Sequence, residues 1–323
     1  MRKIFSAMLV SLAMMLTVCK GPEEEQVGTA RSEVAPVVES AGKGKPAGKK
    51  HPTKAWILAC RVHGRGFGCF PGDSAFVTRT GMACEALDEM GELESLPGKE
   101  ELVAWLKSRQ QPDGGFLEAG DYYKNKLLPW GSMSALEPTY WAVKTLRLLG
   151  AEPERPQDAA RFVKARQMPG GAFDSYEIGW NRVRTSEMLY STFWGVGALK
   201  ELGVPVPDSA RIVEWIRSKQ DTSTDMGGFN LGDKILAYYT AQGTYYAVRT
   251  LALLGAEPGR SAAIVKKFLL SDRGQEADGG FEMGHGDDWN NYDHYSRMVD
   301  TYAAVCALAL LGTPLSDSDS SRA

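Results

Sequence analysis

The sequence predicts an all-α protein built from about five helical hairpins in tandem, and three observations lead to that prediction. A phrase containing Gln, Asp, Gly-Gly and Phe recurs along the chain, at Gln110–Phe116, Gln167–Phe173, Gln220–Phe229 and Gln275–Phe281. The first Gly of each pair stands at 114, 170, 227 and 279, in steps of 56, 57 and 52 residues. Each unit also pairs an amphipathic segment with a more apolar one. A fixed period of this length is the signature of a repeat architecture.

The first half of each unit has apolar residues returning every three or four positions, which predicts a helix buried on one face. These segments are Glu101–Leu106, Ala160–Lys164, Ile212–Ile216 and Ile264–Leu269. The second half is apolar on most faces, which predicts an interior helix. These segments are Thr139–Gly150, Ser191–Gly203, Thr244–Gly255 and Thr301–Gly312. Each ends in Gly with Pro soon after, a typical helix stop.

The Gly-Gly-Phe phrase is expected to be the turn between the two helices of a unit. Glycine supplies positive φ where the chain must reverse, and Asp tolerates such a bend. The Phe side chain is expected to fill the gap between neighbouring hairpins.

The N-terminal part of the chain reads as a targeting segment followed by a linker. Arg2 and Lys3 precede an apolar run that ends at Cys19, so residues 1–19 are predicted to be a signal peptide. Leu16–Cys19 is similar to a bacterial lipobox, although Val18 departs from the small residue usual there. We expect an exported protein of the outer membrane or periplasm, anchored in the membrane by lipid on Cys19; secretion without acylation is the alternative. Residues 20–53 predict a flexible tether, 54–314 one domain, and 315–323 a frayed tail.

The overall composition is that of an ordinary soluble protein. The formal net charge is -3 and 43% of the residues are hydrophobic. Without a basic excess, no nucleic-acid partner is expected. Cys84 is predicted to be free and buried, whereas Cys60 and Cys69 flank a Gly-rich turn and could pair in an oxidising compartment.

Two further segments extend the likeness from a repeat to a known family. Asp300–Gly312 and Gly66–Gly72, together with the Gln-x-x-Asp-Gly-Gly-Phe phrases, resemble the repeats of protein prenyltransferase β subunits and of squalene and hopene cyclases. The resemblance covers nearly the whole domain. It implies an α/α toroid, in which an outer ring of amphipathic helices surrounds an inner ring of apolar helices and a central cavity.

The catalytic signatures of these families are absent from the matching positions. The resemblance places zinc ligands Asp, Cys and His at Gln242, Thr244 and Ala303, none of which is such a ligand. It also implies an Asp-x-Asp-Asp acid in the cyclases, and the closest string, His285–Asp288, lacks the first Asp. Neither mechanism is therefore expected to carry over.

Aromatic residues recur near the start of each interior helix. If these helices converge, the rings line an apolar pocket suited to an isoprenoid or another lipid, and by cation-π attraction to a carbocation. The alternative is that they simply fill the core. The candidate ligand-binding residues are Tyr140, Trp141, Tyr190, Trp194, Tyr245, Tyr246 and Tyr302.

Carboxylates and histidines at the same end of the units supply candidate chemistry. Asp300, Glu187 and His294 are the candidates for acid/base roles, and a cavity-facing carboxylate ahead of an interior helix, Glu137 included, would be a proton donor with a raised pKa. Stabilisation of a helix N-terminus is the alternative. His285, Asp287 and His294 could bind zinc or another divalent metal, or belong to a solvated loop.

Three functions follow from these observations. The sequence favours binding of an apolar small molecule or a protein partner at the cavity or its rim, without the standard catalysis of the family. The first alternative is an active prenyltransferase or terpene cyclase acting on an isoprenoid. The second is a polysaccharide-active α/α-barrel enzyme, for which rim aromatics and paired carboxylates would be suitable.

Overall fold

The computed structural model describes residues 52–118, 134–175, 189–222, 227–230, 239–260 and 262–270, and five positions between 304 and 311. Its helices alternate between two layers. The outer helices are α2 (Pro52–Ala59), α4 (Lys99–Lys107), α6 (Pro156–Lys164), α8 (Ser209–Ser218) and α10 (Ala262–Leu269). The inner helices are α3 (Val77–Glu89), α5 (Leu136–Leu148), α7 (Leu189–Glu201) and α9 (Ala241–Leu253).

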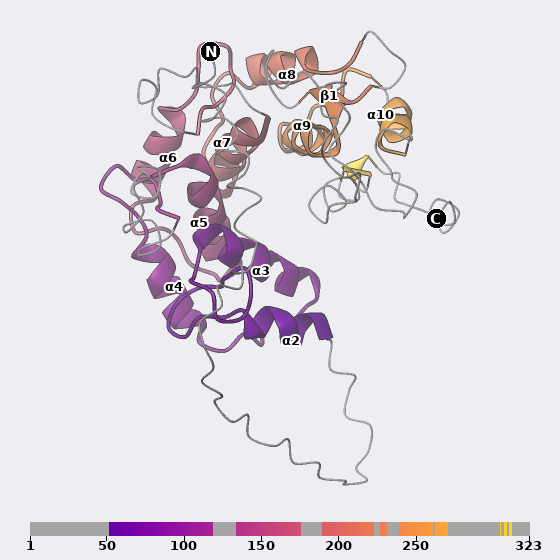
Figure 1. Cartoon of the computed structure of the whole chain (residues 1–323). Helices are drawn as coiled ribbons and strands as arrows, with labels where there is room; N and C mark the ends of the chain where they lie inside the picture. The colour runs from indigo at the N-terminus through magenta and orange to yellow at the C-terminus, as the bar shows by residue number, and fades with distance from the viewer. Residues whose placement is uncertain are drawn as a thin grey trace, which may run out of the picture.

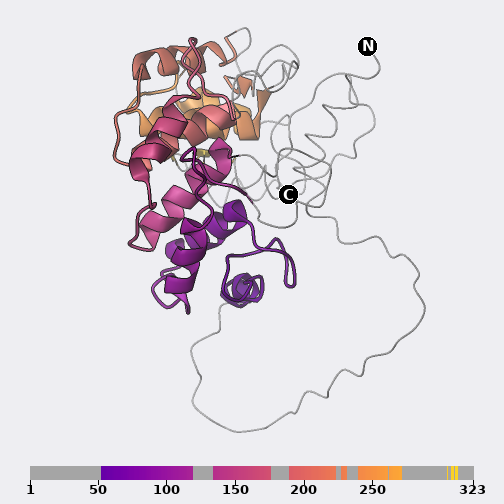
Figure 2. The same cartoon turned by 90° about the vertical axis from the view of Figure 1, so that its left-hand side faces the viewer.

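The inner helices follow one another around an arc. Helix α3 packs against α5, α5 against α7 and α7 against α9, while α4, α6 and α8 cover α5, α7 and α9 from outside (Figure 1). Figure 2 shows the same arc from the side, with α2 at the bottom and α8 to α10 at the top. Further along the chain, positions 304, 307, 308 and 310 are also helical. One short antiparallel pair, β1 (Phe229–Asn230) with β2 (Tyr239–Thr240), is added to the expected helices.

The inner helices are buried along most of their length, as their sequence predicts. In α7, every residue from Leu189 to Leu199 is buried except Tyr190, and α5 is buried from Pro138 to Leu146. Each inner helix ends in a left-handed residue, with φ of 67° at Gly91, 72° at Gly150, 68° at Gly203 and 69° at Gly255. The amide after each of these glycines bonds back into the last helical turn, as Ala151 N–H does to the Leu146 carbonyl at 2.8 Å.

A Phe and a Thr join each turn to the following inner helix. The Phe amide donates to the Thr hydroxyl oxygen, and each of these Phe residues is at most 1% exposed. The pairs are Phe67–Thr80 (2.9 Å), Phe116–Thr139 (3.0 Å), Phe173–Thr192 (3.1 Å) and Phe229–Thr244 (3.1 Å). The hydroxyls of Thr80 and Thr139 in turn donate to a carbonyl four residues back. A buried backbone donor is thereby satisfied at every junction.

A Gln side chain joins each turn to the next unit. Gln110 donates from Nε2 to the carbonyls of Gly114 (3.1 Å) and Arg155 (2.9 Å), and its Oε1 accepts from the Arg155 amide. Gln167 donates likewise to the carbonyls of Gly171 and Pro207. The same residue type therefore makes the same bridge in successive units.

The glycine of the turn is required by close approach as well as by its φ. Gly114 has φ 93°, and a Cβ there would lie 2.3 Å from the Asp158 carbonyl in α6. In the next unit the equivalent residue is Gly171, with φ 98°. A Cβ there would lie 3.0 Å from the carbonyl carbon of Arg211 in α8. The repeat period counted on the first Gly of each pair aligns Gly114 with Gly170. The structure instead makes Gly171, one residue later, the equivalent of Gly114. Bridges pairing Gln110 with Phe116 and Gln167 with Phe173 establish the corrected register.

Cysteine chemistry in the described residues is simple. None of Cys60, Cys69 and Cys84 forms a disulfide, so the possible Cys60–Cys69 bond is not made. Burial raises the pKa of the Cys84 thiol to about 12, in agreement with the expected free, buried cysteine.

Among the described helices, none has the length and apolar character needed to cross a membrane.

Candidate functional site

The junction Thr marks the same position in every inner helix and so gives a common register. Positions two before, two after and five after it share one helix face. We call them the first layer (Thr78, Glu137, Tyr190, Gln242), the second layer (Met82, Trp141, Trp194, Tyr246) and the charged layer (Glu85, Lys144, Gly197, Arg249). Contacts between layer members on different helices show that this face points into the arc.

The aromatic members of the first two layers form one cluster across α7 and α9. The Tyr190 ring lies 4.9 Å from the Trp194 ring and 6.3 Å from the Tyr246 ring, and Trp194 and Tyr246 are 6.4 Å apart. Trp194 is buried at 3% exposure, whereas Tyr190 and Tyr246 are half-buried. Tyr190 and Tyr246 are therefore the members of this cluster that are not fully buried.

Tyr140 and Trp141 are wedged between neighbouring inner helices. A Cβ at Gly197 would lie 2.7 Å from the Tyr140 ring, and one at Gly81 would lie 2.4 Å from the Trp141 ring. Glycine on the facing helix thus makes room for each ring. Their burial corresponds to core filling, the alternative that the sequence left open, except that the indole Nε1 of Trp141 is buried without a hydrogen-bond partner.

A carboxyl group in the first layer has an altered acidity. The pKa of Glu137 is raised to about 8, mainly by burial and also by the nearby charge of Glu118, against the opposing effect of Arg79. Glu118 accepts hydrogen bonds at Oε1 from the Thr78 amide and hydroxyl, while its Oε2 is buried and unpartnered. The pKa of Glu118 is also raised, by burial. Glu137 therefore holds a proton at neutral pH and could donate it.

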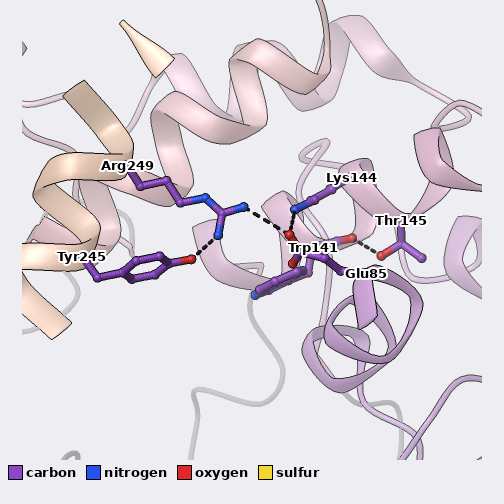
Figure 3. A network of polar contacts seen from close by, with 6 residues as sticks. All are labelled: Glu85, Trp141, Lys144, Thr145, Tyr245 and Arg249. Atoms are coloured by element: carbon purple, nitrogen blue, oxygen red, sulfur yellow. Dashed lines mark hydrogen bonds and ion pairs between the residues drawn. The ribbon is translucent and has the colours of Figure 1, made fainter. Parts of the chain in front are cut away.

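The charged layer joins three inner helices by ion pairs (Figure 3). Glu85 of α3 accepts from Lys144 of α5 and, at 3.2 Å, from Arg249 of α9. Arg249 also donates to the Tyr245 hydroxyl. Burial alone would raise the pKa of Glu85, but Lys144 and Arg249 outweigh it and lower that pKa. The charged layer was not among the predicted site residues. Its signal in the sequence is a charged residue five positions after the junction Thr in three of the four described inner helices.

Several predicted residues lie outside the described part of the chain. They are Cys19, Glu187, His285, Asp287, His294, Asp300 and Tyr302. Within the described part, no group of three or more His, Cys, Asp or Glu could hold a metal ion. At the start of α9, where the family resemblance places zinc ligands, stand Gln242 and Thr244, and the Thr244 hydroxyl already accepts from the Phe229 amide. These residues do not fit zinc.

Comparison of the whole chain with known structures supports the toroid. Candida albicans protein geranylgeranyltransferase-I, solved with GGPP, is 15% identical with a TM-score of 0.63, covering 84% of this chain and 83% of its own. A variant of type II terpene cyclase MstE from Scytonema, solved with geranylgeranyl dihydroxybenzoate as substrate, is 16% identical (TM-score 0.53; 83% of each chain). A protein from Actinoplanes is 16% identical (TM-score 0.55; 80% and 81%). At these identities the likeness concerns the fold alone.

Family models match most of the domain. The squalene-hopene cyclase C-terminal domain matches residues 59–179, and the prenyltransferase α/α toroid domain matches residues 130–232, 181–288 and 240–323. No curated protein matches the chain. The overlapping matches follow from the repeats and confirm the predicted all-α toroid. The chain thus belongs to the family of prenyltransferase α/α toroid domains.

Proposed function

We propose that this protein binds an apolar, isoprenoid-like ligand against Tyr190 and Tyr246, without zinc-dependent prenyl transfer. The observation that carries the proposal is the aromatic cluster of α7 and α9, in which Tyr190 and Tyr246 are only half-buried while Trp194, in contact with both, is buried. Aromatic surface on the inner side of the arc suits a flexible hydrocarbon chain. Two proteins of the same fold were solved with ligands that carry a geranylgeranyl group or its diphosphate.

The residues at the start of α9 support the part of the proposal that excludes zinc. Gln242 is an amide, and the Thr244 hydroxyl holds the Phe229 turn. A zinc site that activates a thiolate is built from Cys, His and carboxylate ligands with a free lone pair, and neither Gln242 nor Thr244 is of these types. At the start of α9, the described residues therefore do not supply this set of zinc ligands.

The test is binding of geranylgeraniol to the full-length protein, measured by native mass spectrometry and by quenching of tryptophan fluorescence. Tyr190→Ala and Tyr246→Ala are each expected to weaken binding by about tenfold, in line with loss of one well-packed aromatic contact. Trp56→Ala on outer helix α2, where the ring is 57% exposed, is the matched control and should bind like the wild type. No binding by the wild-type protein would refute the proposal and favour a protein partner.

A second candidate function is protonation of an alkene by Glu137. The carboxyl is neutral at pH 7, and its charge, when present, acts on Tyr246. Transfer of its proton to an alkene carbon would leave a carboxylate and a tertiary carbocation, which the faces of Tyr190 and Tyr246 would stabilise. Attack of a second alkene of the same substrate would close the ring, and loss of a proton to water or back to the carboxylate would give the neutral product. Incubation of polyprenyl substrates with the protein, followed by mass spectrometry of the products, tests this. Cyclised product that is lost in Glu137→Gln supports it, and unchanged substrate argues against it.

The proposed location is the bacterial cell envelope, with a lipid anchor on Cys19. The support is the sequence pattern of residues 1–19 and the polar linker that follows. Metabolic labelling with a fatty acid and cell fractionation test it, with Cys19→Ser as the variant. Label on the wild type but not the variant is expected; an unlabelled, soluble wild-type protein would rule out the anchor.

A further inference from the structure

We propose that the charged layer binds the acidic head group of the ligand, which makes that ligand a carboxylate at the end of an apolar chain. The inference rests on the proposed function and adds the chemical class of the head group. Three observations support it: the balance of charge in the layer, an unpartnered donor beside it, and its position relative to the aromatic cluster.

The charge balance in this layer is positive among the described residues. Lys144 and Arg249 share one carboxylate, that of Glu85, and the fourth member of the layer is Gly197. The side chains are 11%, 20% and 21% exposed for Lys144, Arg249 and Glu85. The remaining positive charge is largely shielded from water, which costs free energy of desolvation. A second anion bound in the layer would offset that cost.

In and beside the charged layer, the side chains offer more hydrogen-bond donors than hydrogen-bond acceptors. Arg249 donates to Glu85 and to the Tyr245 hydroxyl. Lys144 donates one hydrogen bond, to Glu85, and its ammonium has further N–H groups with which to bind an acceptor. The Trp141 indole N–H is buried and has no partner. In Figure 3 the indole nitrogen lies on the side of the ring that faces α9, from which Arg249 extends. A carboxylate between them would accept from both side chains.

A purely structural role explains only part of this arrangement. One ion pair between Glu85 and Arg249 is enough to join α3 to α9. Lys144, whose ammonium lies 5.5 Å from the Trp141 ring centre, joins α5 to the same carboxylate. These structural roles leave the layer with one positive charge in excess and the Trp141 N–H without an acceptor. A half-filled polar network is costlier than an apolar one unless a ligand completes it.

The spacing of the layers fits one chain-like molecule. The first layer and the charged layer are seven residues apart on each inner helix, so they are separated by roughly 10 Å at 1.5 Å per residue. An apolar chain of about eight carbons would cover that distance. Its carboxylate would lie at Arg249 and its hydrocarbon would extend along Trp194 and Tyr246 toward Tyr190.

The experiment compares three ligands with the same chain: geranylgeranoic acid, its methyl ester and geranylgeraniol. Their dissociation constants for the full-length protein are measured at pH 7 by titration calorimetry. We expect the wild-type protein to bind the acid at least tenfold more tightly than the ester. Arg249→Gln should reduce this preference to less than about twofold, and Trp141→Phe, which removes only the N–H donor and some ring area, should reduce it about threefold.

Two further variants separate a binding role from a structural one. Glu85→Gln removes the carboxylate that competes for the two cations, so it should increase the preference for the acid, which a merely structural network would not do. Arg147→Gln at the end of α5, whose side chain is 62% exposed, should change nothing. Equal affinity of the wild type for acid and ester would overturn this inference alone. Failure of all three ligands to bind would overturn the proposed function as well.

Discussion

The junctions between repeats and the inner face of the arc follow opposite rules. At the junctions the same residues recur and make the same contacts: Gln110 and Gln167 bridge to the next unit, and Phe116 and Phe173 donate to Thr139 and Thr192. On the inner face, equivalent positions differ in every unit, from Glu85 to Lys144, Gly197 and Arg249. Repetition therefore maintains the fold, while variation among units makes the interior of the arc asymmetric.

The strongest test of this comparison removes a junction ring. Phe173→Ala is expected to lower the free energy of unfolding by about 3–5 kcal/mol, because the ring is fully buried and lies against Gly195 of α7. Chemical denaturation followed by circular dichroism measures it. Phe70, which is 38% exposed, is the control, and Phe70→Ala should cost less than about 1 kcal/mol. Equal losses in the two variants would contradict the importance assigned to the junctions.

The turn glycine gives the next largest effect. Gly114→Ala is expected to cost about 2–4 kcal/mol, because it combines positive φ with a Cβ 2.3 Å from the Asp158 carbonyl. Gly72 is the matched control: its φ is 89° but a Cβ there would meet nothing within 4 Å. Gly72→Ala should show the backbone strain alone, about 1–2 kcal/mol. Thermal denaturation of both variants measures the difference between their losses of stability. Equal losses would mean that the contact of Gly114 with α6 does not require the absence of a Cβ.

The junction hydroxyl gives a smaller effect. Thr192→Val keeps the side-chain shape and leaves the Phe173 amide without its acceptor, so a loss of about 1–3 kcal/mol is expected. The buried Thr145 hydroxyl, by contrast, donates only to the Trp141 carbonyl of its own helix. Thr145→Val should cost clearly less in the same urea titration. If the two variants lost the same stability, the hydrogen bond from the Phe173 amide to the Thr192 hydroxyl would not stabilise the fold more than an ordinary intrahelical bond.

The smallest stability effect is expected on the inner face, at Glu137. Its folded-state pKa of about 8 lies above the ordinary value of 4.5, so the stabilising contribution is present below pH 4.5 and is lost as the pH rises toward 8. Because the side chain is only half-buried, we expect a total loss of about 1 kcal/mol. Glu137→Gln should flatten the dependence of the unfolding free energy on pH between 5 and 8. A variant with the wild-type slope would show that another group titrates.

The local features of the fold could be predicted because they depend on neighbours in sequence. The left-handed ends at Gly150 and Gly203, and the buried character of α5 and α7, follow from residue types at helical spacing. The match of Gly114 to Gly170 was one residue wrong, because the pairing of Gln167 with Phe173 decides the register. The role of the Thr side chains was likewise not visible, because each accepts from a turn 13 to 23 residues earlier.

By itself, the sequence determined the repeat, the alternation of amphipathic and apolar helices and the helix ends, because these depend on short-range sterics and hydrophobic periodicity. Only the tertiary structure decided which inner-face residues meet. Glu85 and Arg249 are 164 residues apart, and their contact exists only because the arc brings α3 and α9 together. The pKa of Glu137 depends in the same way on Glu118 and Arg79 from other segments. Electrostatics act through space, so no pattern along the chain could have specified them.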